Sequence, residues 1–326
     1  MKYTIFGESH GPAIGVVLEG VPADFEPDME RIRAELARRA PGSSPTATAR
    51  KEADEPEILS GIFDGKTTGA PICAVIRNTD THSADYGELG YKPRPSHSDY
   101  AAWVKYNGAN DYRGGGHFSG RLTAPLVFAG ALAKQLLEKK GISVSGRICR
   151  LGGKDEPSPE EINELILAAK NDLDSVGGVI ECTISGLAAG LGGPDMGDDI
   201  EGEIARGVFA VPGVKGVEFG AGFALSDMRG SQANDAFRME GRNVVTATNN
   251  AGGVNGGISN GMPVVFRAAL RPTPSIGLKQ LTVDLRTMTD AELTVKGRHD
   301  PCIVPRALPA IEAAAALAIV SIIEKG

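Results

Sequence analysis

Residues 111–121 read DYRGGGHFSGR and pass directly into an apolar, alanine-rich stretch that stops at Gly141. Three glycines ahead of a helix leave backbone amides free, and the helix dipole favours an anion at that end. Arg113, Ser119 and Arg121 add hydrogen-bond donors for a phosphate or a carboxylate. A flexible glycine turn without a ligand is the alternative, but arginines on both sides favour anion binding. We therefore predict an anion-binding glycine turn followed by a helix.

The rest of the pattern predicts an α+β protein. Helical periodicity and suitable end residues, including a Ser-x-x-Glu capping box, predict helices over 27–39, 121–140, 159–170 and 308–324. Short segments with β-branched or aromatic residues predict strands over 3–6, 14–19, 72–77, 179–184 and 263–270. Because helices and strands do not alternate strictly, a layered α+β arrangement is favoured over a doubly wound parallel sheet. No change of composition marks a linker, so a single domain over residues 1–326 is expected.

Composition places the chain among ordinary globular proteins and argues against several other classes. Of its 326 residues 41% are apolar and 23% are charged, and the net charge of −7 argues against a nucleic-acid-binding face. The four cysteines have neither disulfide-like nor zinc-ligand spacing, which is typical of a reduced cytosolic protein without a structural metal. No signal-peptide pattern is evident, and the longest apolar stretch, 313–323, is short for a membrane span. We expect a cytoplasmic protein that binds neither membrane nor nucleic acid.

Two histidines lie in short segments between glycine or proline residues. His10 belongs to GESHG at 7–11, directly after a predicted strand, and imidazole suits acid–base chemistry because its unperturbed pKa is near neutrality. The alternative for this motif alone is a histidine that bonds the backbone of a turn. His97 belongs to RPSHSDY at 94–100, where Asp99 is placed to orient the imidazole ring. Both histidines are candidates for proton transfer.

The C-terminal part combines glycines, cations and hydroxyl groups. Residues 252–257 read GGVNGG, and residues 271–275 read RPTPS. In the second segment a cation, two hydroxyls and adjoining amides can hold a terminal phosphate. Arg298 beside Asp300 offers an anion clamp next to a carboxylate base. The alternative for that pair is a surface ion pair, typically worth ~1 kcal/mol or less.

Taken together and in this order, six segments resemble those of chorismate synthases. They are GESHG at 7–11, RPSHSDY at 94–100, DYRGGGHFSGR at 111–121, MEGRN at 239–243, GGVNGGISNG at 252–261 and GRHDPC at 297–302. The resemblance implies one layered β-α-β sandwich with a helical middle layer, assembled as a homotetramer. It also implies a lyase that converts 5-enolpyruvylshikimate 3-phosphate to chorismate and phosphate by anti-1,4-elimination. Reduced FMN is then required but not consumed.

The resemblance also implies roles for individual residues. His10 is expected to act as an acid near the leaving phosphate, His97 to sit by the reduced flavin and tune its protonation, and Asp300 to take part in removing the C-6 proton, relayed through flavin N5. The expected flavin contacts are His117, Phe118, Ser119, Gly256, Arg271, Pro272, Thr273, Pro274, Ser275 and Arg298. The expected substrate contacts are Ser9, Arg39, Arg50, Arg113 and Arg121. A substrate with two carboxylates and a phosphate needs several arginines, and this net-acidic chain concentrates arginine near these segments.

The sequence departs from the family pattern at three places. Pro45 stands where an arginine that contacts substrate or NADPH is frequent, and His117 stands where arginine is common. Pro274 belongs to RPTPS, which replaces a lysine-proline-threonine-serine-serine pattern. No Gly-x-Gly-x-x-Gly fingerprint is present, so NADPH is expected only as a reductant of the flavin. A separate flavin reductase is then a candidate partner.

Two other functions stay open at the level of sequence. One is a flavin oxidoreductase that consumes NAD(P)H, and the other is a non-catalytic scaffold whose glycine loops capture anions. The number of phosphates released per flavin distinguishes the lyase from the oxidoreductase. A scaffold predicts that His10→Ala and His97→Ala keep their ligand affinity and have no activity to lose.

Overall fold

Two antiparallel sheets are the largest β-structures of the chain. The computed structural model describes residues 1–40, 54–79, 87–193, 195, 197–295 and 300–325. The four-stranded sheet has the order β1-β2-β6-β3, with β1 at Lys2–Gly7, β2 at Ala13–Glu19, β6 at Ile72–Arg77 and β3 at Pro56–Ser60. The five-stranded sheet has the order β10-β15-β9-β7-β8, with β10 at Val214–Phe219, β15 at Val264–Leu270, β9 at Gly178–Ser185, β7 at Ser143–Leu151 and β8 at Lys154–Asp155.

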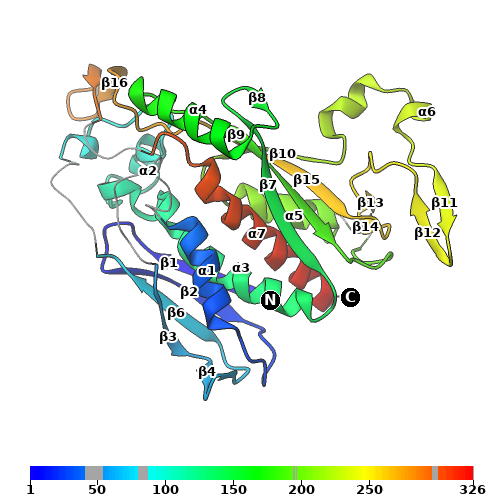
Figure 1. The fold of residues 1–326 in the computed structure, drawn as a ribbon. Helices are drawn as coiled ribbons and strands as arrows, with labels where there is room; N and C mark the ends of the chain where they lie inside the picture. Colours follow the sequence, from blue (N-terminus) through cyan, green and yellow to red (C-terminus); the bar gives the residue numbers. More distant parts are fainter. Residues whose placement is uncertain (41–53, 80–86, 194, 196, 296–299, 326) are drawn as a thin grey trace.

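Four helices lie in the space between these sheets (Figure 1). They are α1 at Met29–Arg39, α3 at Thr123–Glu138, α5 at Ile200–Phe209 and α7 at Val304–Lys325. Helix α3 packs along α7 and contacts β2 and β6 of the first sheet, whereas α7 contacts β7 and β9 of the second. The fold is therefore mixed α+β with several antiparallel sheets, as the element pattern predicted.

Small residues allow the two longest helices to approach closely. Residues 313–316 of α7 are four consecutive alanines, all buried. Gly130 of α3 lies directly against Ala313, and a Cβ added at Gly130 would overlap the Ala313 side chain and backbone. Helix α7 is long and apolar enough to cross a membrane, but it is mostly buried within the protein. The helix is thus a core helix of this fold.

Shorter elements lie around this core. They are η2 at Glu88–Gly90, η3 at Arg113–Phe118, η4 at Gly120–Leu122, η5 at Gly222–Asp227, α2 at Asp99–Lys105, α4 at Pro159–Asn171, α6 at Gly230–Ala233, β4 at Ile62–Phe63, β5 at Lys66–Thr67, β11 at Phe237–Glu240, β12 at Asn243–Thr246, β13 at Val254–Asn255, β14 at Ile258–Ser259, β16 at Gln280–Asp284 and β17 at Thr289–Leu293. Figure 1 shows α2 and β16 at one end of the helical layer and β11 to β14 at the other.

Every helix and strand predicted from the sequence is confirmed, with boundaries that move by a few residues. The capping box of α4 is present, because the Ser158 hydroxyl accepts from the Glu161 N–H at 3.3 Å and the Glu161 carboxylate accepts from the Ser158 N–H at 2.8 Å. Helix α7 begins at Val304 rather than 308, since Pro305 lies in the first turn, where a missing N–H breaks no helical hydrogen bond. The pattern did not predict α5, β7 or β10.

Candidate active site

The turn after β1 presents Ser9 and His10. The Gly11 N–H donates to the Glu8 carbonyl at 3.0 Å, which closes a tight turn with Ser9 and His10 at its two corners. Both corner residues are buried, with 2% and 7% of their surface exposed. The strand therefore delivers a hydroxyl and an imidazole side by side into the protein interior.

The triple glycine of η3 contacts both predicted catalytic histidines. Gly114 has a φ of 58°, and a Cβ added there would overlap the His10 ring. Gly115 has a φ of 87°, and a Cβ there would lie 3.3 Å from Cε1 and 3.4 Å from Nε2 of His97. The Gly116 carbonyl accepts from the Ser9 N–H at 3.1 Å. Glycine is thus required here for close approach, and the two imidazoles, 87 positions apart in sequence, meet at one turn.

His97 is held by a buried carboxylate. Its Nδ1 lies 2.6 Å from Asp99 Oδ1, and the Arg94 guanidinium donates to both oxygens of Asp99 at 2.7 and 2.8 Å. The short contact with a carboxylate requires that Nδ1 carries the proton, so that Nε2, the atom facing Gly115, is an acceptor in the neutral ring. Burial lowers the pKa of His97, the hydrogen bond to Asp99 opposes this effect, and Arg94 reinforces it. Burial alone would raise the pKa of Asp99, but hydrogen bonds from Arg94 and His97 outweigh it and the pKa is strongly lowered.

The 271–275 segment joins the His97 segment. Arg94 donates from Nη1 to the Ser275 hydroxyl at 3.0 Å, and Arg271 donates to the Ser96 carbonyl. The Thr273 hydroxyl is buried and has no hydrogen-bond partner among the described residues. These contacts bring a predicted phosphate-binding segment next to a predicted catalytic histidine.

A buried cluster of arginines forms the other side of the site. Arg39, at the end of α1, donates to Asp54 at 2.5 Å and to the Thr123 hydroxyl at 3.1 Å. Arg121, at the start of α3, donates to the other oxygen of Asp54. Burial lowers the pKa of Arg39 to about 10, an effect that Asp54 opposes and that the neighbouring Arg306 and Arg121 reinforce. Arg39 still carries its charge at neutral pH.

Asp300 is connected to this cluster through Arg306 of α7. Arg306 donates from Nη1 to Asp300 Oδ2 at 2.6 Å and from Nε to the Arg39 carbonyl at 3.1 Å. Asn78 completes the connection on the opposite side, because it bonds both Arg121 and the turn that carries His10. The three predicted catalytic residues therefore belong to one continuous set of contacts.

The structure does not gather every predicted binding residue at this place. Arg113 pairs with Asp111 at 2.8 Å, and its side chain is 41% exposed. Gly256 lies in the β13–β14 turn with open space around it, at the end of the molecule opposite α2 (Figure 1). Arg50 and Arg298 lie outside the described residues.

The predicted residues after the triple glycine do lie beside the site. His117 donates from Nδ1 to the Gly7 carbonyl at 2.9 Å, because a carbonyl oxygen can only accept. Phe118 is 38% exposed, and its ring packs edge-on against His117. The Ser119 hydroxyl accepts from the Arg121 N–H at 3.3 Å and so caps η4.

Sequence reasoning missed four residues that hold the site together. They are Asp54, Asn78, Arg94 and Arg306. Arg94 belongs to the RPSHSDY motif, and the acidic Asp99 in the same motif could have indicated that Arg94 pairs with it. The other three are single polar residues at the edges of elements, and only tertiary contacts reveal their roles.

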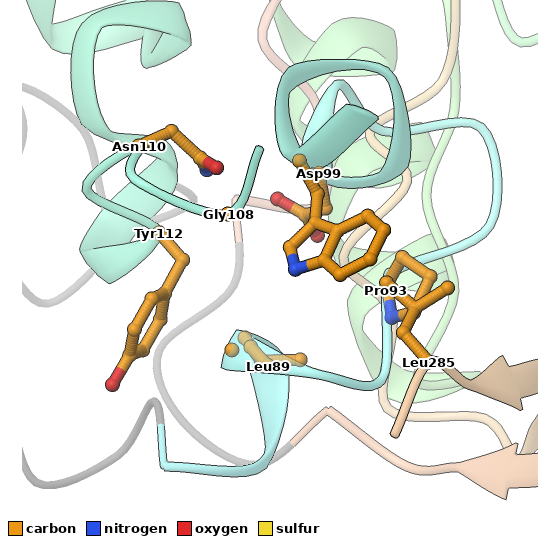
Figure 2. A pocket seen from close by; sticks show the side chains of 9 residues that line it. Leu89, Pro93, Asp99, Gly108, Asn110, Tyr112 and Leu285 are labelled. Carbon is orange, nitrogen blue, oxygen red and sulfur yellow. The ribbon is translucent and has the colours of Figure 1, made fainter. Parts of the chain in front are cut away.

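A small pocket lies next to the Asp99 side chain (Figure 2). Its walls come from the η2 turn, α2, the 108–112 loop and Leu285. The Asn110 side-chain oxygen is buried there without a partner among the described residues. The predicted catalytic residues do not line this pocket, so we do not assign it to the substrate.

Comparison with known proteins identifies the family. The sequence profile of the chorismate synthase family matches residues 1–323. The chain is 49% identical over 337 residues to the chorismate synthase of Thermococcus kodakarensis, covering 98% of this chain and 94% of that protein. The chain belongs to the chorismate synthase family. It is also 43% identical over 340 residues to the Methanosarcina barkeri enzyme, covering 98% of this chain and 93% of that protein.

A solved structure agrees with the sequence matches. A crystal structure of a chorismate synthase superposes with a TM-score of 0.76 at 29% identity, covering 99% of this chain and 91% of that one. The resemblance drawn from the six motifs is thereby confirmed. The activity is that of a chorismate synthase, a lyase of the shikimate pathway and of aromatic amino acid biosynthesis that converts 5-enolpyruvylshikimate 3-phosphate to chorismate.

Proposed function

We propose that the elimination takes place around the 114–116 turn, with His10 as the acid for the leaving phosphate and Asp300 as the base for the C-6 proton. The observation that carries this proposal is the continuous set of contacts that links both histidines, the buried arginines and Asp300. An elimination needs an acid and a base on the same ligand, and such a network keeps both in reach of one bound molecule.

The buried arginines bind the anionic groups of the substrate. Among the described residues, Arg39 and Arg121 pair with Asp54 and Arg306 pairs with Asp300, so three guanidinium groups from different parts of the chain lie together. Guanidinium groups bind phosphate and carboxylate through paired hydrogen bonds, and burial strengthens that attraction. The buried Ser9 hydroxyl lies beside His10. This hydroxyl has no hydrogen-bond partner among the described residues. Arg50 and Arg113 are proposed as further substrate contacts.

His97 acts as a neutral acceptor. Burial lowers its pKa, and Asp99 holds the proton on Nδ1, so Nε2 presents a lone pair next to Gly115. A ligand N–H bound over the glycine turn can donate to this atom. His97 thereby influences the protonation of the ligand group that donates to it, without carrying a charge itself.

The residues beside His97 fit a phosphate-bearing cofactor. The buried Thr273 hydroxyl lacks a partner among the described residues, and Arg271, Ser275 and the partly exposed Phe118 ring lie in the same region. The family uses reduced FMN, and this group, when bound, supplies electron density that assists departure of the phosphate without being consumed. The residues that would hold it are His117, Phe118, Ser119, Arg271, Pro272, Thr273, Pro274, Ser275 and Arg298. NADPH enters this proposal only as a reductant of the flavin.

We further propose a single cytoplasmic β-α-β domain over residues 1–326 that assembles as a homotetramer. Gly256 and Arg271 lie at opposite ends of β15, whose seven residues span roughly 20 Å. Gly256 therefore reaches a flavin at His97 only from a second copy of the chain. Exposed apolar side chains on the neighbouring β11–β12 hairpin, Phe237 at 71% and Met239 at 66%, support such an interface. Light scattering should then give the mass of four chains.

Anaerobic phosphate release with photoreduced FMN tests the reaction. We expect many equivalents of phosphate per flavin, whereas one equivalent of reductant consumed per product would support a flavin oxidoreductase instead. Asp300→Asn should keep FMN and substrate binding but slow product formation by roughly 10²-fold, the scale of a lost general acid or base. Full activity in that variant would remove Asp300 from the mechanism.

A further inference from the structure

Asn78 joins the turn that carries His10 to the arginine at the start of α3. It directly follows β6 and is half-buried. Its Nδ2 donates to the Glu8 carbonyl at 3.0 Å and to the Gly11 carbonyl at 2.8 Å, and its Oδ1 accepts from Arg121 Nε at 3.1 Å. Its backbone N–H also donates to the Pro12 carbonyl at 3.2 Å. Side chain and backbone are therefore both anchored to the segment that follows β1.

These contacts fix the orientation of the amide group. If the amide were flipped, its oxygen would face two carbonyl oxygens and its NH₂ group would face the N–H of Arg121. Two contacts would then join an acceptor to an acceptor, and the third would join a donor to a donor. The orientation found here is the one in which each contact joins a donor to an acceptor, so the residue must have both a donor and an acceptor end.

The two carbonyls that Asn78 binds belong to the first and last residues of the His10 turn. Glu8 and Gly11 bracket Ser9 and His10, so the amide holds the turn at both ends. On the other side, the Ser9 N–H is held by the Gly116 carbonyl. The His10 backbone is thus fixed from β6 and from the glycine turn together.

We propose that Asn78 is a positioning residue that sets the distance between His10 and Arg121, so that the proton donor and the cation meet the same leaving phosphate. This inference rests on the roles proposed above for His10 and Arg121. All three hydrogen bonds of the side-chain amide go to the protein, so it acts through the turn on one side and through the guanidinium on the other. A displacement of about 1 Å at a reacting group can cost roughly 10²-fold in rate.

Two substitutions separate the two ends of the amide. In Asn78→Ala both ends are lost, so we expect kcat to fall by roughly 10²-fold because the His10 turn shifts, and KM to rise because Arg121 loses the acceptor of its Nε. In Asn78→Asp a carboxylate still accepts from Arg121 but cannot donate to the two carbonyls. We expect its KM to stay near the wild-type value while kcat remains low. Anaerobic steady-state kinetics with reduced FMN measure both constants.

Gln135 of α3 provides a matched control. Its amide donates to the Asp28 carbonyl at 3.0 Å and accepts from the Asp28 N–H at 2.8 Å, so it also clamps a backbone segment, but at the start of α1. Gln135→Ala should lower the midpoint of thermal unfolding and leave kcat and KM unchanged. If both Asn78 variants behave like this control, Asn78 is a structural residue and the proposal is wrong.

His10→Ala separates failure of this inference from failure of the proposed mechanism. Full activity in His10→Ala would overturn the role of His10 and, with it, the reason for positioning it. An inactive His10→Ala together with wild-type kinetics in Asn78→Ala would overturn the inference about Asn78 alone. Loss of kcat in Asn78→Asp with retained KM and a cooperative thermal transition is the result that supports it.

Discussion

At the scale of single residues, the site depends on backbone that only glycine can supply. Gly114 and Gly115 both have positive φ, and each lies against one of the two histidines. A side chain at either position would meet both backbone strain and an imidazole ring. The close approach of the two imidazole rings to this turn therefore requires glycine at both positions.

Gly114→Ala tests this requirement. The added methyl group would overlap the His10 ring, so we expect His10 to be displaced and kcat to fall by roughly 10²-fold. The control is Gly65→Ala, because Gly65 also has positive φ, at 78°, but has no atom within 4 Å of the added Cβ. The control should lose about 1–2 kcal/mol of stability through strain and keep its kcat. Equal kcat values in the two variants would show that the close contact at Gly114 does not matter.

From the sequence, site residues could be predicted only where reactive side chains lie together in a short motif. His10, His97 and the triple glycine each lie in a segment whose composition a core or surface role does not require. Asp54 and Arg306 do not lie in such a motif. Their place in the site follows from Arg39, which both of them contact. Contacts between residues far apart in sequence depend on how helices pack, and local patterns do not specify that packing.

At the scale of elements, two consecutive arginines of α1 serve different purposes. Arg38 donates to Glu312 of α7 at 2.7 and 3.0 Å, and Lys134 of α3 donates to the same carboxylate at 2.5 Å. This network, centred on the buried Glu312 carboxylate, holds the end of α1 against both long helices. Arg39, one residue further, is thereby directed toward Asp54 and the site. Helix packing thus places Arg39, a residue that we propose binds the substrate.

The close contact between α3 and α7 should make stability sensitive to added volume at Gly130. Gly130→Ala should destabilise the protein by about 1–3 kcal/mol, because the added methyl overlaps Ala313 in a packed core. Gly207→Ala, on α5, is the matched control, since its nearest atom beyond the helix is the Ala314 carbonyl oxygen at 3.4 Å. There the gain in helix propensity, roughly 0.5–1 kcal/mol, should leave stability equal or higher. Urea unfolding at one fixed protein concentration compares the two, and a stable Gly130→Ala would contradict the tight packing inferred here.

The elements themselves were largely predictable, for a physical reason. Apolar periodicity and end residues are local, and they sufficed for α1, α3, α4 and α7 and for the strands around the core. Strand β7 was missed because Gly146 interrupts its apolar face and the register shift between Ile148 and Arg150 breaks the polar–apolar alternation. Which strands share a sheet depends on pairings such as β15 with β9, and these join residues about 80 positions apart.

At the scale of the whole molecule, stability should fall as the solution becomes acidic. Burial lowers the pKa of His97 from its ordinary value of 6.5, so the unfolded chain takes up this proton more readily than the folded one. The contribution of neutral His97 to the free energy of unfolding is complete above about pH 6.5. It is lost as the pH falls toward the lowered pKa of the folded protein. Asp99, Asp54 and Glu312, whose pKa values are also lowered, add a second loss below about pH 4.

Urea unfolding of the FMN-free protein between pH 7.5 and pH 5 measures the first of these losses. Asp99, Arg94 and Arg271 are the charged groups that act on His97, and the lowered pKa of Asp99 keeps its carboxylate ionised throughout this range. A single proton contributes at most about 1.4 kcal/mol per pH unit. His97→Asn should flatten the dependence in this window. An unchanged slope in that variant would show that His97 titrates normally.

The proposed mechanism requires that distant segments of the chain converge on one ligand-binding chamber. A crystal structure of this chain with FMN and 5-enolpyruvylshikimate 3-phosphate tests this most directly. We expect the phosphate of the substrate to lie between His10 and Arg121, and the flavin to lie against His97 and the 271–275 segment. A complex in which the flavin binds away from His97, or in which His10 does not touch the substrate, would contradict the account.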